Sequence, residues 1–303
     1  MGAMHSPPCF YVMTQQQKSY LYAAMAILAW SSVSTAFKIS LRHLSPIGLL
    51  LISSFSASLF LLAYRCFSKP KRPLEIIRNI RQSIIPALLN PFTYYLVLFE
   101  AYNRLRAQEA QALNYTWAIV LSILSIIVFR ERFRVKDILA LLISFTGVIV
   151  ISSKGRMLSL EFDDVLGTAL AAGSSLIWAA YWILNMRDKR NNIDKLLFNF
   201  ALGFVIILLL SLVLRVPILL PQAIPLYAIL SGVYVGIFEM GLTFVLWMNA
   251  LQLSESTAKV SNLIFLTPFI SLLFIRFTLN EPIHIATIAG LILIITSNII
   301  QKT

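Results

Sequence analysis

The sequence predicts an all-α integral membrane protein with ten transmembrane helices, arranged as two inverted five-helix repeats. Hydrophobic residues make up 58% of the chain and charged residues only 13%, with a mean hydropathy of +0.80. A soluble domain carries about 25% charged residues. The apolar stretches are long enough for transmembrane helices and too long for the strands of a membrane barrel. The second half of the chain also repeats the first.

The repeat is visible in a set of residues at fixed spacing. Asn103, Leu105, Glu109 and Ala112 match Asn249, Leu251, Glu255 and Ala258 at the same offsets. Each set is followed by an apolar run that ends at a glutamate, Glu131 or Glu281. A repeat unit with an odd number of spans must be inverted, because its second copy starts on the opposite face. Inverted repeats are typical of secondary transporters with a substrate site at the repeat interface.

Ten apolar stretches are each long enough to cross about 30 Å of hydrocarbon. They are residues 20–38, 46–65, 83–103, 108–129, 135–152, 165–186, 196–214, 225–250, 256–276 and 283–300. We therefore expect three parts: an N-terminal tail at 1–17, a first repeat at 18–154 and a second, inverted repeat at 155–303. The basic segment 66–82 is the longest connection, and we expect it to lie along the membrane surface.

The distribution of Lys and Arg predicts the orientation. Segment 66–82 and the turn 130–136 are strongly basic, whereas their repeat counterparts, 215–224 and 279–284, hold one Arg and no Lys or Arg respectively. Basic loops stay on the cytoplasmic side. We therefore expect both termini in the cytoplasm and a multi-pass protein of the cell (inner) membrane.

The net charge of +12 is explained by these loops, so we expect the lipid bilayer and a small-molecule substrate as partners, and no nucleic acid. The two cysteines, Cys9 and Cys66, and three scattered histidines do not have metal-site spacing. We expect no metal, no cofactor and no structural disulfide. One chain with both repeats can form a complete transport unit, so a monomer suffices and a dimer is possible.

Several motifs resemble the EamA-type transporters of the drug/metabolite transporter superfamily. They are Trp30 in ILAWSS, the stretch 101–132, its partner 249–282, and GTALAAGSSLIWAAYW, which begins at Gly167 and resembles the opening of the family's second half. NYTW at 114–117 resembles the Asn-Tyr-x-Trp-Pro of bacterial aromatic amino acid exporters, although Ala118 replaces the proline. The resemblance covers residues 18–300 and implies transport, with amino acid export favoured by NYTW. The family's cargo also includes purine-like metabolites, drugs and S-adenosylmethionine.

Ionisable residues inside spans are costly and are therefore candidates for function. Glu239 lies near the middle of the eighth span, where it could bind a substrate amine or carry a coupling proton. The alternative is a buried glutamate hydrogen-bonded to a neighbouring helix. Lys259, one turn into the ninth span, could bind a carboxylate or phosphate, or could extend to the membrane surface as lysines near helix ends commonly do. We expect Lys38 to extend to the surface in this way.

Aromatic residues within spans form the second candidate group: Trp30, Tyr94, Tyr95, Tyr115, Trp117, Trp178, Tyr181 and Trp182. Because they mostly avoid span ends, we expect them to line a central cavity rather than an interfacial belt; ordinary helix packing is the alternative. Ser34, Asn114 and Asn262 add hydrogen-bonding groups. Pro268 would kink the ninth helix and act as a hinge. We expect Glu131 and Glu281 to fix turns rather than to touch cargo.

Together these residues predict a secondary transporter of a small polar or zwitterionic metabolite, such as an amino acid, working by alternating access around a midplane cavity. The first, third, fourth, sixth, eighth and ninth spans would build that cavity. The cargo could instead be S-adenosylmethionine, a purine or a drug-like cation. A membrane-embedded lipid-modifying enzyme is the alternative from another class. The chain lacks clustered histidines, an Asp-rich motif and a Ser-His-Asp set, so we expect no enzyme.

Overall fold

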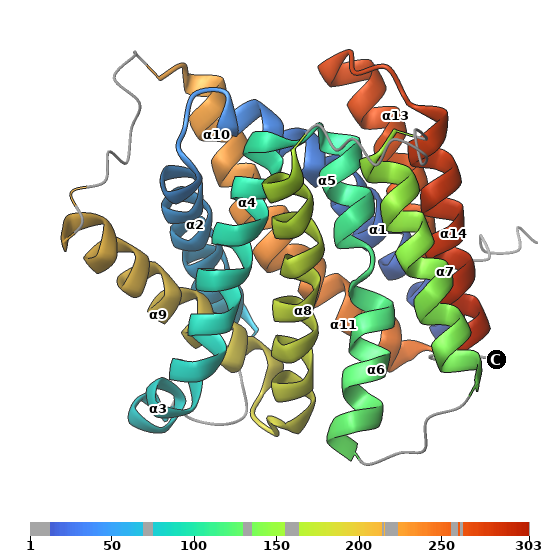
Figure 1. Cartoon of the computed structure of the whole chain (residues 1–303). Coiled ribbons are helices and arrows are strands. Elements are labelled where there is room, and N and C mark those ends of the chain that lie inside the picture. Colours follow the sequence, from blue (N-terminus) through green and yellow to red (C-terminus); the bar gives the residue numbers. More distant parts are fainter. Residues whose placement is uncertain are drawn as a thin grey trace, which may run out of the picture.

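The computed structural model is a bundle of helices (Figure 1). It describes residues 13–68, 75–129, 135–154, 164–213, 215, 224–255, 260 and 263–302, and these contain no β-strand. Within them, seven helical segments are long and apolar enough to cross a membrane, and three shorter apolar helices cover 138–151, 263–279 and 285–300. The chain is therefore a multi-pass helical membrane protein.

The first half of the chain forms α1 (Gln15–Leu41), α2 (Pro46–Phe67), α3 (Ile76–Ala87), η1 (Leu88–Thr93), α4 (Tyr94–Arg104), α5 (Ala107–Asn114), α6 (Trp117–Phe129) and α7 (Val135–Ser152). The second half forms α8 (Val165–Arg187), α9 (Asn192–Val213), α10 (Leu226–Tyr234), η2 (Val235–Leu242), α11 (Thr243–Leu253), η3 (Leu263–Leu266), α13 (Thr267–Leu279) and α14 (Ile285–Lys302).

Local sequence explains where several helices begin and end. The Thr14 hydroxyl and the Gln17 side chain form a capping box at the start of α1. The Asp164 carboxylate accepts a hydrogen bond of 2.6 Å from the backbone N–H of Gly167 and caps α8. Asn280, with φ of 56°, ends α13 in the left-handed conformation that asparagine tolerates. Short polar signals therefore set boundaries within a largely apolar chain.

Three helices begin earlier than the apolar stretches expected from the sequence. Helix α1 begins at Gln15, within the expected N-terminal tail, rather than at 20. Helix α3 begins at Ile76, inside the segment expected to lie along the membrane surface, and α9 begins at Asn192 rather than at 196. In each case polar residues extend the helix beyond its apolar part, so hydropathy alone marks the helix start too late.

Packing between the two halves follows one pattern. Helix α1 packs on α11 and α13 of the second half, and α8 packs on α4 and α6 of the first. Helix α2 packs against η2, and α9 against η1, while α2 pairs with α9 and α7 with α14. The contacts of one half therefore reproduce those of the other when α1 is exchanged with α8, α4 with α11, and α6 with α13. Figure 1 shows α7 and α14 side by side.

The segments η1 and η2 join α3 to α4 and α10 to α11, and they differ in conformation. In η1 the backbone of Asn90 is non-helical, with φ of -144° and ψ of 117°, so α3 and α4 meet at a kink. Segment η2 is a wide, π-helical turn. The Thr93 hydroxyl donates to Leu88 O at 2.7 Å, and the Thr243 hydroxyl donates to Phe238 O. Each hydroxyl satisfies a carbonyl where the regular helical pattern is interrupted within an apolar region.

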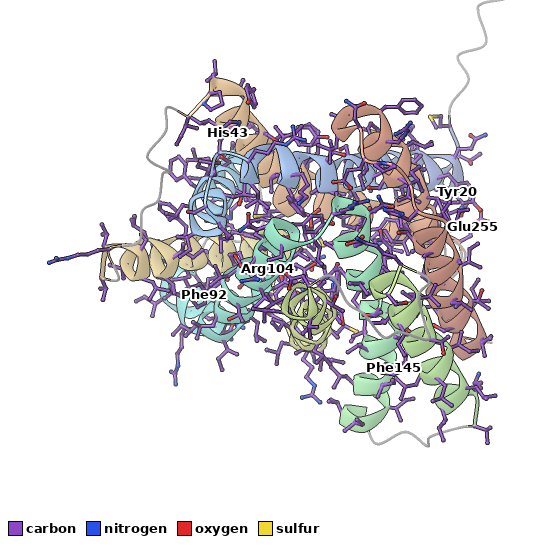
Figure 2. The ribbon with its side chains drawn as sticks, turned by 45° about the horizontal axis from the view of Figure 1, so that its top comes forward. Tyr20, His43, Phe92, Arg104, Phe145 and Glu255 are labelled. Atoms are coloured by element: carbon purple, nitrogen blue, oxygen red, sulfur yellow. The ribbon has the colours of Figure 1, made fainter. Side chains whose placement is uncertain are left out.

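Helices α7 and α14 cross at a pair of glycines, Gly147 and Gly290. A Cβ on Gly147 would lie 2.7 Å from the carbonyl oxygen of Gly290 and 2.9 Å from Cγ1 of Ile294. Small residues at such crossings let helix backbones approach closely, which is a main source of helix association in membranes. The outward face of α7 is apolar: Phe145, labelled in Figure 2, is 62% exposed.

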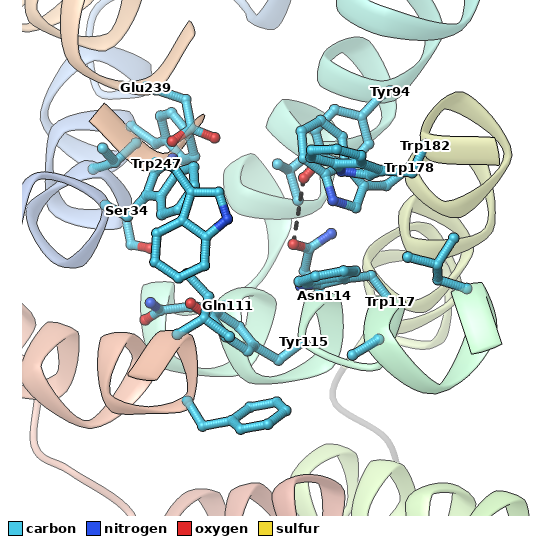
Figure 3. Close-up of a pocket in the computed structure, with 18 of the residues that line it drawn as sticks. Ser34, Tyr94, Gln111, Asn114, Tyr115, Trp117, Trp178, Trp182, Glu239 and Trp247 are labelled. Carbon is cyan, nitrogen blue, oxygen red and sulfur yellow. Dashed lines mark hydrogen bonds between the residues drawn. The ribbon is translucent and has the colours of Figure 1, made fainter. Parts of the chain in front are cut away.

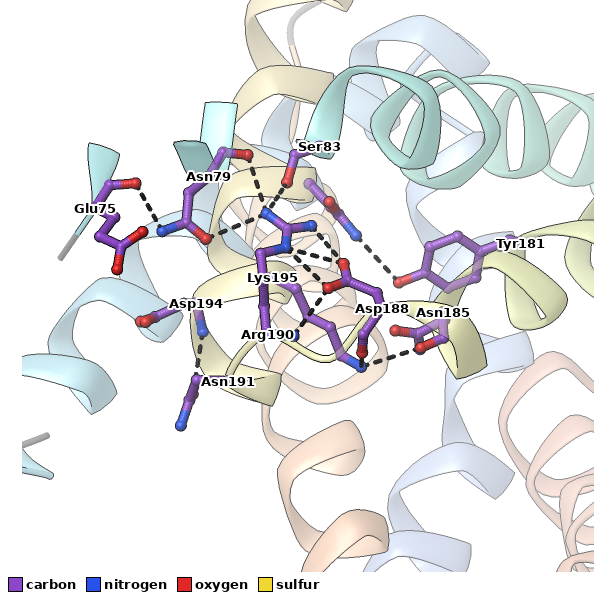
Figure 4. Close-up of polar contacts among 11 residues, drawn as sticks. Glu75, Asn79, Ser83, Tyr181, Asn185, Asp188, Arg190, Asn191, Asp194 and Lys195 are labelled. Carbon is purple, nitrogen blue, oxygen red and sulfur yellow. Dashed lines mark hydrogen bonds and ion pairs between the residues drawn. The ribbon is translucent and has the colours of Figure 1, made fainter. Parts of the chain in front are cut away.

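A polar cluster at the α8–α9 connection ties these helices to α3 (Figure 4). Arg190, whose side chain is 7% exposed, forms an ion pair of 2.6 Å with Asp188. The same guanidinium donates to the backbone oxygen and Oδ1 of Asn79, and at 2.8 Å to the Ser83 hydroxyl. Burial disfavours the charged Asp188 carboxylate, but hydrogen bonds from Arg190 outweigh it and hold the pKa of Asp188 below its ordinary value.

We expect Gly147→Ala to destabilise the protein, because the new methyl group must push α7 and α14 apart. Overpacking of this kind costs about 1–3 kcal/mol. Thermal unfolding of the detergent-purified protein should show a lower midpoint. Gly173→Ala in α8 is the matched control, since a Cβ there meets no atom within 4 Å. Equal midpoints for the two variants would contradict the close crossing.

We expect Asp188→Asn to destabilise the protein at neutral pH, since removing one partner of a buried ion pair costs roughly 3–5 kcal/mol. The bonds that Arg190 keeps to Asn79 and Ser83 place the loss at the lower end. Because the folded-state pKa of Asp188 is lowered, its contribution is present above the unfolded pKa and is lost as pH falls through the folded pKa. Unfolding midpoints of variant and wild type should converge in acid; a constant difference would contradict this.

Candidate functional site

A cavity of about 440 Å³ lies at the centre of the bundle. Its described lining comes from α1, α4, α5, α6, α8, η2, α11 and η3, which correspond to the six spans expected from the sequence. All five tryptophans of the chain line this cavity: Trp30, Trp117, Trp178, Trp182 and Trp247. Tryptophan in membrane proteins usually gathers at the interfaces. Its concentration here indicates a cavity suited to an organic molecule (Figure 3).

The rings form a connected array across the two halves of the chain. Tyr94 of α4 stacks on Trp178 of α8, with centroids 4.6 Å apart and planes at 30°. Trp30 of α1 meets Trp247 of α11 at 5.6 Å. Phe244 joins these two groups, since it contacts Trp30 at 6.1 Å and Trp178 at 5.9 Å. Aromatic pairs at these separations stabilise the contact beyond the area they bury.

Glu239 supplies the cavity's carboxylate. It lies within η2, and its Oε1 accepts a hydrogen bond of 3.1 Å from the Tyr95 hydroxyl. Among the residues that the structure describes, no Lys or Arg forms an ion pair with it. Figure 3 shows the carboxylate at the edge of the cavity, above Trp247. A carboxylate held by a single phenol in an apolar bundle needs a cation or a proton to offset its burial.

Two amides occupy α5, and Figure 3 shows both apart from Glu239. Asn114 Nδ2 donates to the Ser174 hydroxyl at 2.8 Å, and its Oδ1 accepts a weak hydrogen bond of 3.4 Å from Tyr94. Gln111, one turn earlier, also lines the cavity and is 5% exposed. Ser34 completes the polar lining through a 2.8 Å hydrogen bond shared with Tyr102. These groups can hydrogen-bond a ligand without adding charge.

Most of the candidate residues come together here. The cavity is lined by Trp30, Ser34, Tyr94, Asn114, Tyr115, Trp117, Trp178, Trp182 and Glu239. Tyr95 and Tyr181 are fully buried and lie outside the lining; Tyr95 bonds Glu239, and Tyr181 accepts a 3.5 Å hydrogen bond from Asn199. Lys259 and Asn262 lie outside the described residues. Pro268 occupies the first turn of α13 and therefore starts a helix. That these residues bind substrate stays a prediction.

Sequence reasoning missed Gln111, Tyr102 and Trp247, all of which line the cavity. Helical spacing could have found each one. Gln111 precedes Asn114 by three residues, Tyr102 follows Tyr94 by two steps of four, and Trp247 follows Glu239 by eight. Positions three, four, seven and eight apart share one helix face. Extending each candidate along its own face would have completed the set.

A polar network joins α5 to the turn between α13 and α14. The Gln108 side chain donates to Pro282 O at 2.8 Å and accepts from the His284 backbone N–H at 3.0 Å. The backbone N–H of Ala107 donates to Glu281 Oε1 at 3.3 Å, and Arg106 shares a hydrogen bond with His284. Gln108 is fully buried and lies one turn from Gln111, which lines the cavity, so this network lies next to the cavity. Glu281 thus contacts the neighbouring helix α5; that it fixes its own turn stays a prediction.

Lys38 does not extend to the membrane surface as expected. Its Nζ donates a 2.6 Å hydrogen bond to the backbone oxygen of Tyr102, in the part of α4 that faces α1. The carbonyl is available because it lies in the last turn of α4, where the helix offers no intrahelical N–H partner. Lys38 therefore joins α1 to the C-terminal turn of α4.

A multi-pass helical bundle with an internal cavity shared by both halves is the architecture of a membrane carrier. The chain belongs to the EamA-like transporter family, part of the drug/metabolite transporter superfamily. The family model matches twice, over residues 17–153 and 165–300. In the described residues there is no group of three or more His, Cys, Asp or Glu side chains that could hold a metal ion.

Relatives carry the same general description. The chain is 24% identical to an "Uncharacterized transporter" of Archaeoglobus fulgidus, with 91% of this chain and 95% of that protein covered. It is 26% identical to the "Uncharacterized transporter YvbV" of Bacillus subtilis, covering 73% and 71%. A solved crystal structure with 20% identity aligns over 93% of this chain and 95% of the other with a TM-score of 0.62, which shows a shared fold.

We expect Gln108→Ala to loosen the junction between α5 and the α13–α14 turn and so to open the cavity, because it removes both side-chain hydrogen bonds to residues 282–284. A loss of about 1–2 kcal/mol should raise opening roughly five- to thirty-fold. The readout is the rate at which a membrane-impermeant maleimide labels Ser34→Cys in a background with Cys9 and Cys66 replaced by serine. Gln82→Ala, at an exposed position on α3, is the control. The same labelling rate in both variants would show that the network does not close the cavity.

Proposed function

We propose that this protein is a secondary transporter that moves a small polar or zwitterionic metabolite, an amino acid or a related compound, by efflux or exchange. The observation that carries this proposal is the cavity that both halves of the chain build together. It contains every tryptophan of the chain and one carboxylate, Glu239. Membership in the EamA-like transporter family supports the transport function. An organic body can rest on the rings while a polar group meets Glu239.

The proposed architecture is ten spans in two inverted five-helix repeats, covering 18–154 and 155–303. Support comes from the contact pattern that survives exchange of the halves, in which α2 packs against η2 and α9 against η1. We place both termini in the cytoplasm and the protein in the inner membrane, on the Lys and Arg distribution. A single chain holds a complete cavity, so a monomer suffices for transport.

Alternating access requires a cavity that is closed at one end while the other gives passage. The network around Gln108 and His284 supplies such a closure between α5 and the α13–α14 turn. Because α5 belongs to the first half and that turn to the second, rocking of one half against the other would separate them. Pro268, at the start of α13, is the hinge we propose for this movement.

Within this mechanism Glu239 would meet the amino group of the cargo or carry a coupling proton. Asn114 and Gln111 would hydrogen-bond neutral polar groups, and the tryptophans would hold the organic body. Lys259 and Asn262 complete the proposed set. S-adenosylmethionine, purines and drug-like cations are the other cargo classes compatible with the family resemblance.

The first test is counterflow of radiolabelled compounds in proteoliposomes, over amino acids, purines and S-adenosylmethionine, with and without a pH gradient. We expect saturable counterflow for one class, and a response to the gradient if Glu239 carries a proton. Folded protein that exchanges no compound in the panel would count against the amino acid assignment.

We expect Glu239→Gln and Trp117→Ala each to reduce counterflow by about tenfold or more, a loss of at least 1.4 kcal/mol of interaction with the cargo. Phe145→Ala is the matched control, because Phe145 is an exposed aromatic on the outer face of α7. Wild-type kinetics in both cavity variants, with folded protein in the vesicles, would refute this site.

A further inference from the structure

The cavity has charge of one sign, negative, in its described lining. Its described lining contains the carboxylate of Glu239 and no Lys or Arg side chain. Lys38 lies one turn beyond Ser34 on α1, and its Nζ is bonded to the Tyr102 backbone oxygen instead of to the cavity. A bound amine would therefore find an opposite charge, whereas the carboxylate of a zwitterion would not find one in this part of the site.

The aromatic lining adds to the same preference. Figure 3 shows Trp247 beside Glu239, and Trp178 and Trp182 on the opposite side of the cavity. Trp30 packs on Trp247, with ring centroids 5.6 Å apart. Ring faces carry negative charge density and attract cations, most strongly when water is excluded. The same faces stack on a planar apolar body.

Neutral amides occupy the remaining polar part of the cavity. Gln111 and Asn114 can donate to a carbonyl or hydroxyl of the cargo. They cannot offset a full negative charge, and burying an unpaired carboxylate is costly. The Asn114 amide is also already engaged by Ser174 and Tyr94. A neutral carbonyl is thus accepted at this end more readily than a carboxylate.

From this arrangement we infer that the cavity selects organic cations, amines on a planar apolar body with no carboxylate, over the corresponding zwitterions and anions. The inference rests on the transport function proposed above and, among the cargo classes named there, favours compounds of net positive charge over zwitterionic amino acids. The amine lies against Glu239 and the body lies among the tryptophans.

Four probes that share a phenyl ring but differ in charge test the contributions of the amine and of the carboxylate to binding separately. Phenethylamine carries the amine alone, and phenylalaninamide adds a neutral carbonyl. Phenylalanine adds a carboxylate to the amine, and phenylpropanoate has the carboxylate alone. Because all five tryptophans line the cavity, the intrinsic fluorescence of the purified protein reports binding directly. Counterflow of labelled phenethylamine and phenylalanine in proteoliposomes then measures transport separately.

We expect phenethylamine and phenylalaninamide to bind at least about tenfold more tightly than phenylalanine, and phenylpropanoate to bind most weakly. Glu239→Gln should abolish this ranking. Glu100→Gln is the matched control, because Glu100 lies on neighbouring α4, outside the cavity lining, and pairs with Arg104 at 2.8 Å. The control should keep the wild-type ranking, and thermal unfolding confirms that both variants are folded.

Phenylalanine binding as tightly as phenethylamine would overturn the inference, as would an unchanged ranking in Glu239→Gln or no fluorescence response to any probe. The two proposals fail in different ways. If phenylalanine is exchanged better than phenethylamine, transport stands and the cation preference falls. If the amines bind with the expected ranking and neither compound is exchanged, the cation site stands and the transport function falls.

Discussion

The position of the Glu239 carboxylate in the interior of an apolar helical bundle is the constraint on which the central cavity depends. An isolated charge in such a medium is strongly unfavourable unless polar groups or water reach it. Glu239 receives one hydrogen bond, from Tyr95, and otherwise faces the cavity. The wide turn η2 carries this glutamate, and the packing of α2 against η2 and α1 fixes that turn. The cavity therefore reduces the cost of placing the carboxylate inside the bundle, because water or a ligand can reach it there. In turn, the carboxylate is the charged group of the described cavity lining.

The two halves are alike in their packing. Helix α1 of the first half contacts α11 and α13 of the second, and α8 of the second half contacts α4 and α6 of the first. The network around Gln108 joins the start of α5 to the α13–α14 turn, and it therefore also connects the two halves. In the proposed mechanism this polar junction separates when one half rocks against the other.

The sequence predicts the membrane class, the duplicated family and most of the cavity lining, because these follow from hydropathy, internal repetition and the cost of polar groups in spans. It does not predict the helical start at Ile76 or the inward-held Lys38, because both depend on tertiary partners. Tyr95 and Tyr181 show the same limit: an aromatic within a span can face the cavity or lie behind it. Tyr94 lines the cavity, whereas adjacent Tyr95 lies behind the lining, because neighbouring side chains on a helix point about 100° apart.

The aromatic rings of the cavity belong to helices of both halves, so proposed cargo binding and proposed movement of the halves involve the same side chains. Tyr94 and Trp30 belong to helices of the first half, and their partners Trp178 and Trp247 belong to the second. A molecule held between these rings contacts both halves at once. A ligand shifts a conformational equilibrium only by its difference in affinity for the two states. In the proposed alternating-access mechanism, rocking of the halves would change the separation of the paired rings. The aromatic contacts proposed to hold the cargo would then also be the contacts through which binding favours one conformation over the other.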